Sequence, residues 1–466
     1  MKKILSLFAA GAIALAATAQ ENITPEVLST LKQGYEGNAA DRARQSVVSN
    51  GSFRKLAMRP VVNTTGTNTH FSIDIRNTGI SDQQSSGRCW MFTGLNVLRN
   101  KAMKKMGVTG FQFSQIYLFF YDQLEKSNLF LQGIIDTRSE SIDHQKVQWL
   151  MQNPLSDGGT YTGVADLVSK YGLVPAEVQA ETWASNNTNE IDGHLKRKLR
   201  EIAINIRELA EAGKSETELQ VYKVEQMKTI YQMLALAYGE PVQEFLWAPR
   251  GKDGKLLSEL KKYTPLEFYH EYCAEAGDLQ NDYIMLMNDP SRPYNKVYEI
   301  DMDRHTYDGH NWLYLNLDIK DLAPIAIASL KDSTQMYFSC DVGKFLDSKN
   351  GILDIQAWDY NSLLGTTFGM NKKQRIQTRD SGSSHAMTLM AVDLDDQGNP
   401  IKWKVENSWG AASGHNGYLI MTNEWFNEYM FRVVVNKKYM PKKLLKLMEQ
   451  KPILLPAWDP MFMEEQ

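Results

Sequence analysis

The sequence predicts an α+β fold in which a helical half faces a β-rich half, with a large helical insertion between them and an N-terminal arm. Three observations carry this prediction. Apolar residues recur at helical spacing after Cys89, two further amphipathic helices are indicated within residues 186–239, and segments with strand-like alternation gather after Ser384. A chain of 466 residues is long enough for one large unit with insertions.

The composition is that of a globular protein and does not favour binding to nucleic acid or to a membrane. Hydrophobic residues make up 43% of the chain and aromatic residues 10%, which is ordinary for a globular protein. The net charge of −4 provides no general attraction for nucleic acid or for an anionic membrane. No Cys-x-x-Cys motif or His-rich spacing indicates a metal site, and no cofactor is predicted.

The cysteines do not form a disulfide framework, because the chain has only three of them, Cys89, Cys273 and Cys340. If Cys89 stays free, only Cys273 and Cys340 are left to pair with each other. Two isolated, partly buried thiols are the alternative, and the sequence leaves both open.

The first 19 residues have the three parts of a secretory signal peptide. Lys2 and Lys3 precede an apolar run over residues 4–17, and Ala17-Thr18-Ala19 provides a small-residue cleavage site. A buried or membrane-anchoring helix is the alternative, although the run is short for a membrane span. The sequence therefore predicts an exported protein, periplasmic or secreted, with no membrane-spanning segment.

Residues 20–70 are predicted to form an N-terminal arm, and the main domain is predicted over residues 71–466. The arm is polar with few periodic apolar positions, and Asn63-Thr64-Thr65-Gly66-Thr67 is typical of a loop. Residues 71–75 alternate in polarity and predict a short strand that leads into the turn around Gln83.

A helix is predicted to begin at Cys89 and to end at a left-handed cap, Gly107. A thiol in the first turn meets unpaired backbone N–H groups and the positive end of the helix dipole, which lower a cysteine pKa and favour a nucleophilic thiolate. The alternative is that Cys89 is a small buried hydrophobic residue. The apolar face of this helix consists of Phe92, Leu95, Leu98, Ala102 and Met106.

Gln83 is the candidate for stabilising a negative charge beside the sulfur. It lies six residues upstream of Cys89, across a turn that contains Gly87. From there its carboxamide N–H and the backbone N–H of Cys89 can both be aimed at an oxyanion.

A helical insertion is predicted over about residues 186–300. Ser215 and Glu218 form a capping box between two amphipathic helices, which we expect to pack as a hairpin. The apolar stripes predict core or subunit contacts rather than a ligand site. They consist of Leu195, Leu199, Ile202, Ile206 and Leu209 in the first helix, and of Leu219, Met227, Ile230 and Leu234 in the second.

The region after Ser384 predicts a β-hairpin and two further strands. Residues 387–393 form an apolar run, residues 395–400 a turn cluster, and residues 401–405 alternate in polarity. The further strands are predicted over residues 417–421 and 431–435.

Pairing within this hairpin brings His385, at the start of the first strand, close to Asn407, at the end of the second. An imidazole there can hold a thiolate as an ion pair and later protonate a leaving amine. The Asn407 amide oxygen can orient the ring, and Trp409 can shield that bond from water. An ordinary hydrogen-bonded histidine is the alternative. His415 is the competing candidate, and its turn-like surroundings predict that it is exposed.

These residues together resemble a known family. Gln83, Cys89 and Trp90, with His385 and Asn407-Ser408-Trp409-Gly410 downstream, resemble the papain-like cysteine peptidases. The form Ser85-Ser86-Gly87-Arg88-Cys89-Trp90 is similar to the bleomycin hydrolase and aminopeptidase C branch, peptidase family C1B. Further matching segments are Phe113-Ser114-Gln115, Tyr171-Gly172-Leu173-Val174-Pro175, Cys340-Asp341-Val342-Gly343-Lys344 and Leu455-Pro456-Ala457-Trp458-Asp459-Pro460-Met461.

The resemblance implies a papain-like fold and peptide hydrolysis through a thioacyl-enzyme. In this chain Cys89 corresponds to the nucleophile, His385 to the proton shuttle, Asn407 to the residue that orients it, and Gln83 to the oxyanion donor. The resemblance also places Trp90 in the substrate cleft. Cys340-Asp341 receives no chemical role.

The resemblance implies a substrate-binding wall at Asp157-Gly158-Gly159, where missing side chains let a peptide backbone pair with that of the enzyme. A plain turn is the alternative for this segment alone. It further implies that the tail, residues 452–466, lies in the cleft, where the carboxylate of Gln466 meets the free amine of a peptide. A frayed terminus is the alternative there.

The implied activity is therefore that of an aminopeptidase acting on peptides, and the implied assembly is a homohexamer. Neither follows from residue spacing. Three alternatives remain: an endopeptidase whose tail lies outside the cleft, an acyl transferase that uses the same Cys-His pair, and an oligomeric binding protein that keeps the scaffold without catalysis.

Overall fold

The computed structural model describes residues 22–35, 37–59, 67–76 and 79–461. The predicted signal peptide, residues 1–19, lies outside the described residues, as do Gln466 and most of the predicted loop at residues 63–67. The chain divides into two compact units. The first contains Met1–Met58 and Trp358–Phe368, and the second contains Arg59–Ala357 and Gly369–Gln466.

The smaller unit consists of short helices: α1 (Pro25–Gln33), α2 (Ala39–Val48), α3 (Phe53–Ala57) and α13 (Tyr360–Leu364). Thr24 and Asn38 cap α1 and α2 with their side chains. Trp358 joins the two parts of the unit, because its indole N–H donates to the carbonyl of Arg54 at 2.9 Å. The sequence predicted the arm but not its helices, which are short; α1 and α2 bury no residue.

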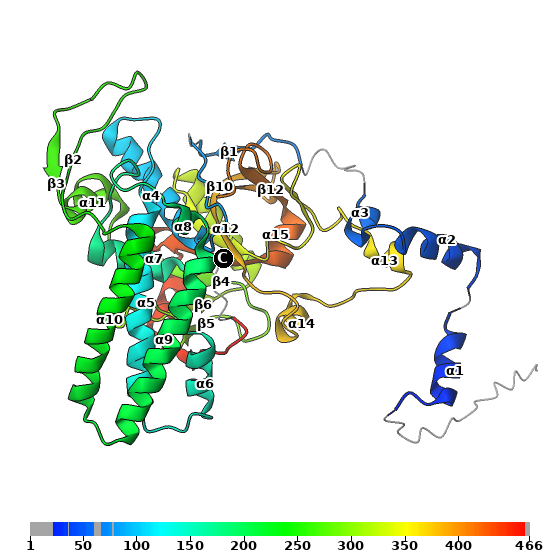
Figure 1. The fold of residues 1–466 in the computed structure, drawn as a ribbon. Helices are drawn as coiled ribbons and strands as arrows, with labels where there is room; N and C mark the ends of the chain where they lie inside the picture. Colours follow the sequence, from blue (N-terminus) through cyan, green and yellow to red (C-terminus); the bar gives the residue numbers. More distant parts are fainter. Residues whose placement is uncertain (1–21, 36, 60–66, 77–78, 462–466) are drawn as a thin grey trace, which may run out of the picture. The chain divides into compact units, whose positions relative to one another are not determined.

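The larger unit combines helices with one extended sheet (Figure 1). Its helices are α4 (Cys89–Met106), α5 (Gln115–Asp136), α6 (Gln145–Gln152), α7 (Tyr161–Tyr171), α8 (Trp183–Asn186), α9 (Thr188–Glu211), α10 (Glu216–Tyr238), α11 (Pro265–Cys273), α12 (Ile319–Lys331), α14 (Lys372–Gln377), α15 (Asn423–Tyr429) and α16 (Lys442–Leu445). Three short 3₁₀ helices are Ala274–Ala276, Lys437–Tyr439 and Lys446–Glu449.

Within the described residues the sheet has 12 strands, in the order β14-β5-β6-β4-β13-β7-β10-β11-β12-β9-β8, with β1 also pairing with β10. The bounds are β1 (Ile73–Asp74), β4 (Tyr283–Met287), β5 (Lys296–Ile300), β6 (Leu313–Asn316), β7 (Met336–Cys340), β8 (Leu346–Asp347), β9 (Ile352–Leu353), β10 (His385–Leu394), β11 (Pro400–Glu406), β12 (Tyr418–Thr422), β13 (Met430–Asn436) and β14 (Ile453–Leu455). A separate hairpin pairs β2 (Phe245–Trp247) with β3 (Lys261–Tyr263).

Helix α4 has the predicted bounds. It begins at Cys89 and ends at Gly107, whose φ of 69° and ψ of 27° are left-handed. All five predicted apolar positions are buried. The helix packs against β10 and β7, so that its first turn meets the start of β10.

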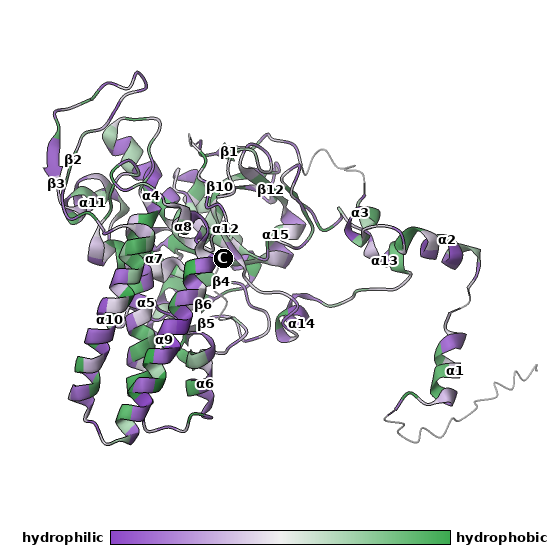
Figure 2. Ribbon diagram, viewed as in Figure 1, coloured by the Kyte–Doolittle hydropathy of each residue, from purple (hydrophilic) through white to green (hydrophobic). Residues whose placement is uncertain are grey.

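The two predicted insertion helices are α9 and α10, and they pack on each other and on α5 (Figure 1). The capping box of Ser215 and Glu218 opens α10. Figure 2 shows purple and green alternating along both helices, as expected of amphipathic segments. After α10 the predicted helical insertion also contains strands, because β2 and β3 form a hairpin and β4 and β5 belong to the large sheet.

The predicted hairpin is formed by β10 and β11, which are antiparallel. Thr388 pairs with Glu406, so Asn407 follows directly after the paired part of β11. On the other side of β10, His385 pairs with Cys340 of β7. The strands predicted at residues 71–75, 417–421 and 431–435 are β1, β12 and β13.

All three cysteines are free and buried, so Cys273 and Cys340 remain separate thiols. Burial raises the pKa of Cys273 to about 12, against a smaller lowering effect of Lys101. At neutral pH Cys273 is therefore protonated and unreactive. Among the described residues, no helix combines the length and the apolar character needed to cross a membrane.

A buried ion pair joins the helical half to the β-rich half. Nη2 of Arg99, on α4, lies 2.5 Å from Oε1 of Glu406, at the end of β11, and both side chains are at most 1% exposed. The pair therefore connects the helix that begins at Cys89 to the strand that ends before Asn407.

We expect Arg99→Met to lower the free energy of unfolding by about 3–5 kcal/mol, because it removes the buried positive charge that faces the Glu406 carboxylate. Urea unfolding measures this change. The double variant Arg99→Met/Glu406→Leu should lose less free energy of unfolding than Arg99→Met alone, because it also removes the carboxylate. An unchanged unfolding midpoint in Arg99→Met would show that the pair does not hold the two halves together.

Candidate active site

Cys89 lies at the first position of α4, in contact with the β-rich half. Its Sγ accepts a hydrogen bond from the backbone N–H of Ala386 at 3.4 Å. The sulfur is therefore adjacent to the residue that follows His385, although 297 positions separate Cys89 from Ala386. Cys89 and His385 are 0% and 1% exposed, so both side chains are buried.

The imidazole of His385 is held by Asn407. His385 Nε2 and Asn407 Oδ1 lie 2.8 Å apart, and this oxygen also accepts the backbone N–H of Ser408 at 2.8 Å. The Trp409 ring packs on the imidazole, with 4.7 Å between ring centroids. These contacts fix the plane of the ring and leave Nδ1 as the nitrogen that is not engaged by Asn407.

Gln83 is held at both ends of its carboxamide. Nε2 donates to the carbonyl of Ser86 at 2.6 Å, and Oε1 accepts from the hydroxyl of Ser408 at 2.6 Å. Its backbone N–H also donates to the carbonyl of Ser408 at 2.8 Å. An amide nitrogen carries two hydrogens, so the fixed carboxamide retains one more donor. Ser408, which the sequence analysis quoted without a role, thus orients Gln83.

Asp157 connects three segments of the chain. Its Oδ2 accepts the backbone N–H of Gly87 at 2.6 Å and the hydroxyl of Thr188, the first residue of α9, at 2.5 Å. A Cβ at Gly87 would lie 2.4 Å from Oδ1 of Asp157, so only glycine allows this approach. The carboxylate is therefore occupied by internal contacts and positions the loop before Cys89.

Residues 156–159, which we call the glycine wall, lie against Trp90. The Trp90 indole N–H donates to the carbonyl of Asp157 at 2.9 Å. Gly158 and Gly159 are buried, and a Cβ on Gly159 would lie 2.7 Å from the Trp90 ring. The structure thus brings Asp157, Gly158, Gly159 and Trp90 together next to Cys89.

Arg88 is a buried charge directly before the nucleophile. Its Nη1 lies 2.8 Å from Oε2 of Glu181, and its Nε donates to the hydroxyl of Ser86 at 3.0 Å. The guanidinium also packs over the rings of Phe92 and Phe119 at 5.3 and 5.2 Å. Arg88 is 0% exposed, so its side chain stabilises the turn before Cys89 and is not accessible to a ligand.

Two further predictions from the sequence concern the exposure of His415 and a metal site. His415 is exposed, as predicted. Within the described ranges, no group of three or more His, Cys, Asp or Glu side chains is arranged to hold a metal ion. Sequence reasoning missed the supporting residues Ser408, Thr188 and Arg88, because hydrogen bonds between distant segments leave no local pattern.

A family model described as the peptidase C1-like family matches residues 22–462 of this chain. The chain belongs to this family. Membership confirms the predicted papain-like fold and the predicted class of enzyme, a cysteine aminopeptidase of the bleomycin hydrolase and aminopeptidase C group.

Individual relatives agree with this assignment. Human bleomycin hydrolase is 41% identical over 390 residues, which cover 82% of this chain and 85% of that protein. Aminopeptidase C of Streptococcus thermophilus is 35% identical over 443 residues, which cover 94% and 98%. The crystal structure of PepW from Lactobacillus rhamnosis is 34% identical, covers 95% of this chain and 99% of its own, and superimposes with a TM-score of 0.90.

A double-mutant experiment tests whether Ser408 acts on catalysis by orienting Gln83. We expect Gln83→Ala to lower kcat by about 10²–10³, as for the loss of one oxyanion donor. Ser408→Ala should lower kcat by roughly tenfold, the value of one hydrogen bond that orients the donor. Steady-state kinetics on a peptide reporter measure both.

The two effects should not add, because Ser408 acts through Gln83. In the background of Gln83→Ala, adding Ser408→Ala should change kcat by less than about twofold. Fully multiplicative effects would show that Ser408 has a role independent of Gln83.

Proposed function

We propose that this chain hydrolyses peptide bonds through a thioacyl-enzyme and removes residues from peptides with a free N-terminus. One observation carries the proposal. Cys89 Sγ accepts the Ala386 N–H at 3.4 Å while Asn407 holds the adjacent His385 ring at 2.8 Å. A sulfur at a helix N-terminus next to an oriented imidazole is the arrangement that activates a thiolate nucleophile.

In the first step the Cys89 thiolate attacks the carbonyl carbon of the scissile peptide bond. A C–S bond forms, and the carbonyl electron pair moves onto oxygen. The carboxamide of Gln83 and the backbone N–H of Cys89 donate to that oxyanion. The protonated imidazole of His385 then gives its proton to the leaving nitrogen, the C–N bond breaks, and the C-terminal part of the peptide departs as an amine.

In the second step water releases the acyl group. Neutral His385 takes a proton from water as the hydroxyl attacks the thioester carbon, and the C–S bond breaks to leave a carboxylic acid and the Cys89 thiolate. The hydrogen bond to Asn407 keeps the ring in one orientation through both proton transfers. Packing of Trp409 over the ring keeps water from competing for that bond.

Peptide substrates are proposed to lie along the glycine wall. The missing side chain of Gly159 faces the rings of Trp90 and His305, so we propose that the substrate main chain pairs with the wall at Gly158. Trp90 fixes the wall beside the nucleophile. Restriction to free N-termini is proposed to come from the tail, with the Gln466 carboxylate pairing with the substrate amine. The relatives named aminopeptidase C and the family resemblance support this part.

Two reporters separate exopeptidase from endopeptidase action. We expect a dipeptide reporter with a free N-terminus to be cleaved at least about tenfold faster than its N-acetylated form, because a lost charge pair costs 1.4 kcal/mol or more. Cys89→Ala serves as the inactive control. Faster cleavage of the acetylated reporter would identify an endopeptidase, and transfer to added amines would identify an acyl transferase.

We also propose that the protein is exported and, separately, that it forms a homo-oligomer, a hexamer by family resemblance. The basic start, apolar run and Ala-x-Ala end of residues 1–19 support export. If this is right, the mature chain from a secreting bacterial host begins at Gln20, as read by intact mass. A full-length chain that remains in the cytosol would contradict the proposal.

A further inference from the structure

Three consecutive carbonyls of the glycine wall are held by side chains that lie below it. The carbonyl of Ser156 accepts from Gln123 Nε2 at 2.9 Å and from Lys126 Nζ at 3.0 Å. The carbonyl of Gly158 also accepts from Lys126 Nζ, and the intervening Asp157 carbonyl accepts from Trp90. One ammonium group on α5 therefore bridges two carbonyls of the wall, those of Ser156 and Gly158.

Lys126 is itself buried within a charged cluster. It is 7% exposed, its Nζ lies 3.3 Å from Oδ2 of Asp122, and its charge packs over the Trp90 ring at 5.4 Å. The other carboxylate oxygen of Asp122 lies 2.5 Å from Nδ1 of His305. Burial by itself raises the pKa of Asp122, but the charges of Lys126 and His305 outweigh it and hold that pKa below its ordinary value.

His305 supports the wall by contact. A Cβ added at Gly159 would lie 2.3 Å from the His305 ring, and one added at Gly163 would lie 2.4 Å from it. The same ring packs against Trp90, with 4.6 Å between centroids. The imidazole thus fills the space that two missing side chains leave, while Asp122 fixes its orientation.

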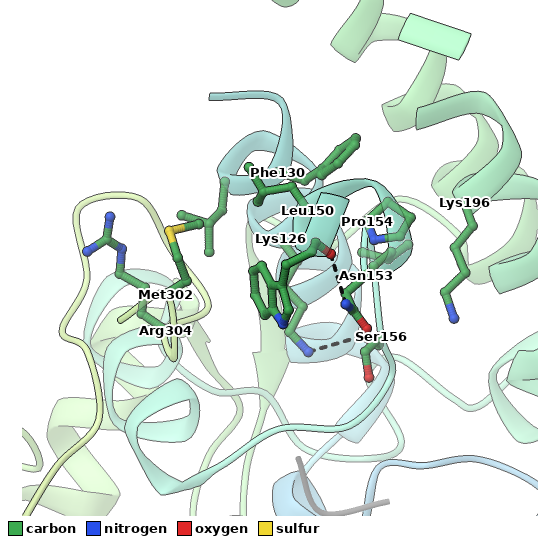
Figure 3. Close-up of a pocket in the computed structure, with 12 residues that line it drawn as sticks. Lys126, Phe130, Leu150, Asn153, Pro154, Ser156, Lys196, Met302 and Arg304 are labelled. Atoms are coloured by element: carbon green, nitrogen blue, oxygen red, sulfur yellow. Dashed lines mark hydrogen bonds between the residues drawn. The ribbon is translucent and has the colours of Figure 1, made fainter. Parts of the chain in front are cut away.

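We propose that Lys126, Asp122 and His305 are positioning residues that set the shape of the glycine wall for binding the substrate main chain. This inference rests on the proposed function, and it assigns the cluster to substrate binding rather than to bond cleavage. Figure 3 shows the hydrogen bond from Lys126 to Ser156. Both residues line a pocket of about 280 Å³. No member of the cluster takes part in proton transfer at Cys89.

A role in substrate binding explains why the chain keeps this charged cluster, because a buried charged cluster contributes little to the stability of the fold. Removing two charges from water costs several kcal/mol per ion, and apolar residues of the same volume would often stabilise a core equally well. A charged donor on a rigid helix does something that an apolar residue does not, because it fixes the direction of two carbonyls at once. A wall with misdirected carbonyls binds the peptide main chain less tightly.

The test compares four variants of the full-length chain. Lys126→Met removes the donor, Lys126→Arg keeps a charged donor, and Lys126→Met/Asp122→Asn also removes the carboxylate charge that faced Lys126. Lys223→Met is the matched control, because Lys223 is also buried and packs on α5 but donates to the side chain of Gln132 at 2.7 Å and to no wall carbonyl. Thermal melting identifies any variant that does not fold.

We expect Lys126→Met to raise KM for a peptide reporter by about tenfold or more, the value of a charge-assisted hydrogen bond, with kcat within about twofold of the original chain. The double variant should melt at a higher temperature than Lys126→Met and keep its raised KM. Lys126→Arg should restore KM in large part, and Lys223→Met should leave it unchanged. An unchanged KM in Lys126→Met, or an equal rise in Lys223→Met, overturns the inference.

Hydrogen exchange gives a readout that does not depend on catalysis. In Lys126→Met the backbone amides of residues 157–160 should exchange about tenfold faster, because the wall opens locally, while those of α10 keep their rates. Unchanged exchange at the wall would overturn the inference even if peptide hydrolysis is seen. Absence of hydrolysis in the original chain, with faster exchange in the variant, would instead count against the proposed function alone.

Discussion

The site depends on one junction, where the first turn of α4 meets the start of β10. The N–H of Ala386 donates to the sulfur of Cys89, and the hairpin register places Asn407 next to the preceding residue, His385. A nucleophile and its base thus come from two halves that are nearly 300 positions apart in the chain. The buried pair of Arg99 and Glu406 acts on the same junction, because it ties α4 to the strand that leads to Asn407.

Around this junction, few side chains act alone. Ser408 orients Gln83, Trp409 covers the bond between His385 and Asn407, and Asp157 links the loop before Cys89 to the base of α9. The helical insertion is therefore part of the support of the site. Its first residues, next to the loop before the nucleophile, determine where that loop lies.

Local patterns predicted the helix that begins at Cys89 and the approach of His385 to Asn407, and the structure contains both. The three-and-four spacing after Cys89 and the alternation around His385 and Asn407 specify a helix start and a hairpin end, and both need only neighbouring residues. The cluster of Lys126, Asp122 and His305 was not predictable, because its members are joined by contacts across up to 183 positions. Strands β4 and β5 were included in a helical insertion because short apolar runs do not distinguish buried strands from helices. The helices of the arm are short, and α1 and α2 bury no residue.

The central claim is that the imidazole of His385 stabilises the Cys89 thiolate. The most direct measurement is the rate at which iodoacetamide alkylates Cys89 across the pH range, identified by peptide mass, in the original chain and in His385→Ala. The account predicts fast alkylation well below pH 7 in the original chain, and in the variant a rate that rises only near pH ~8.5, as for an ordinary thiol. Identical pH profiles in the two proteins would contradict it.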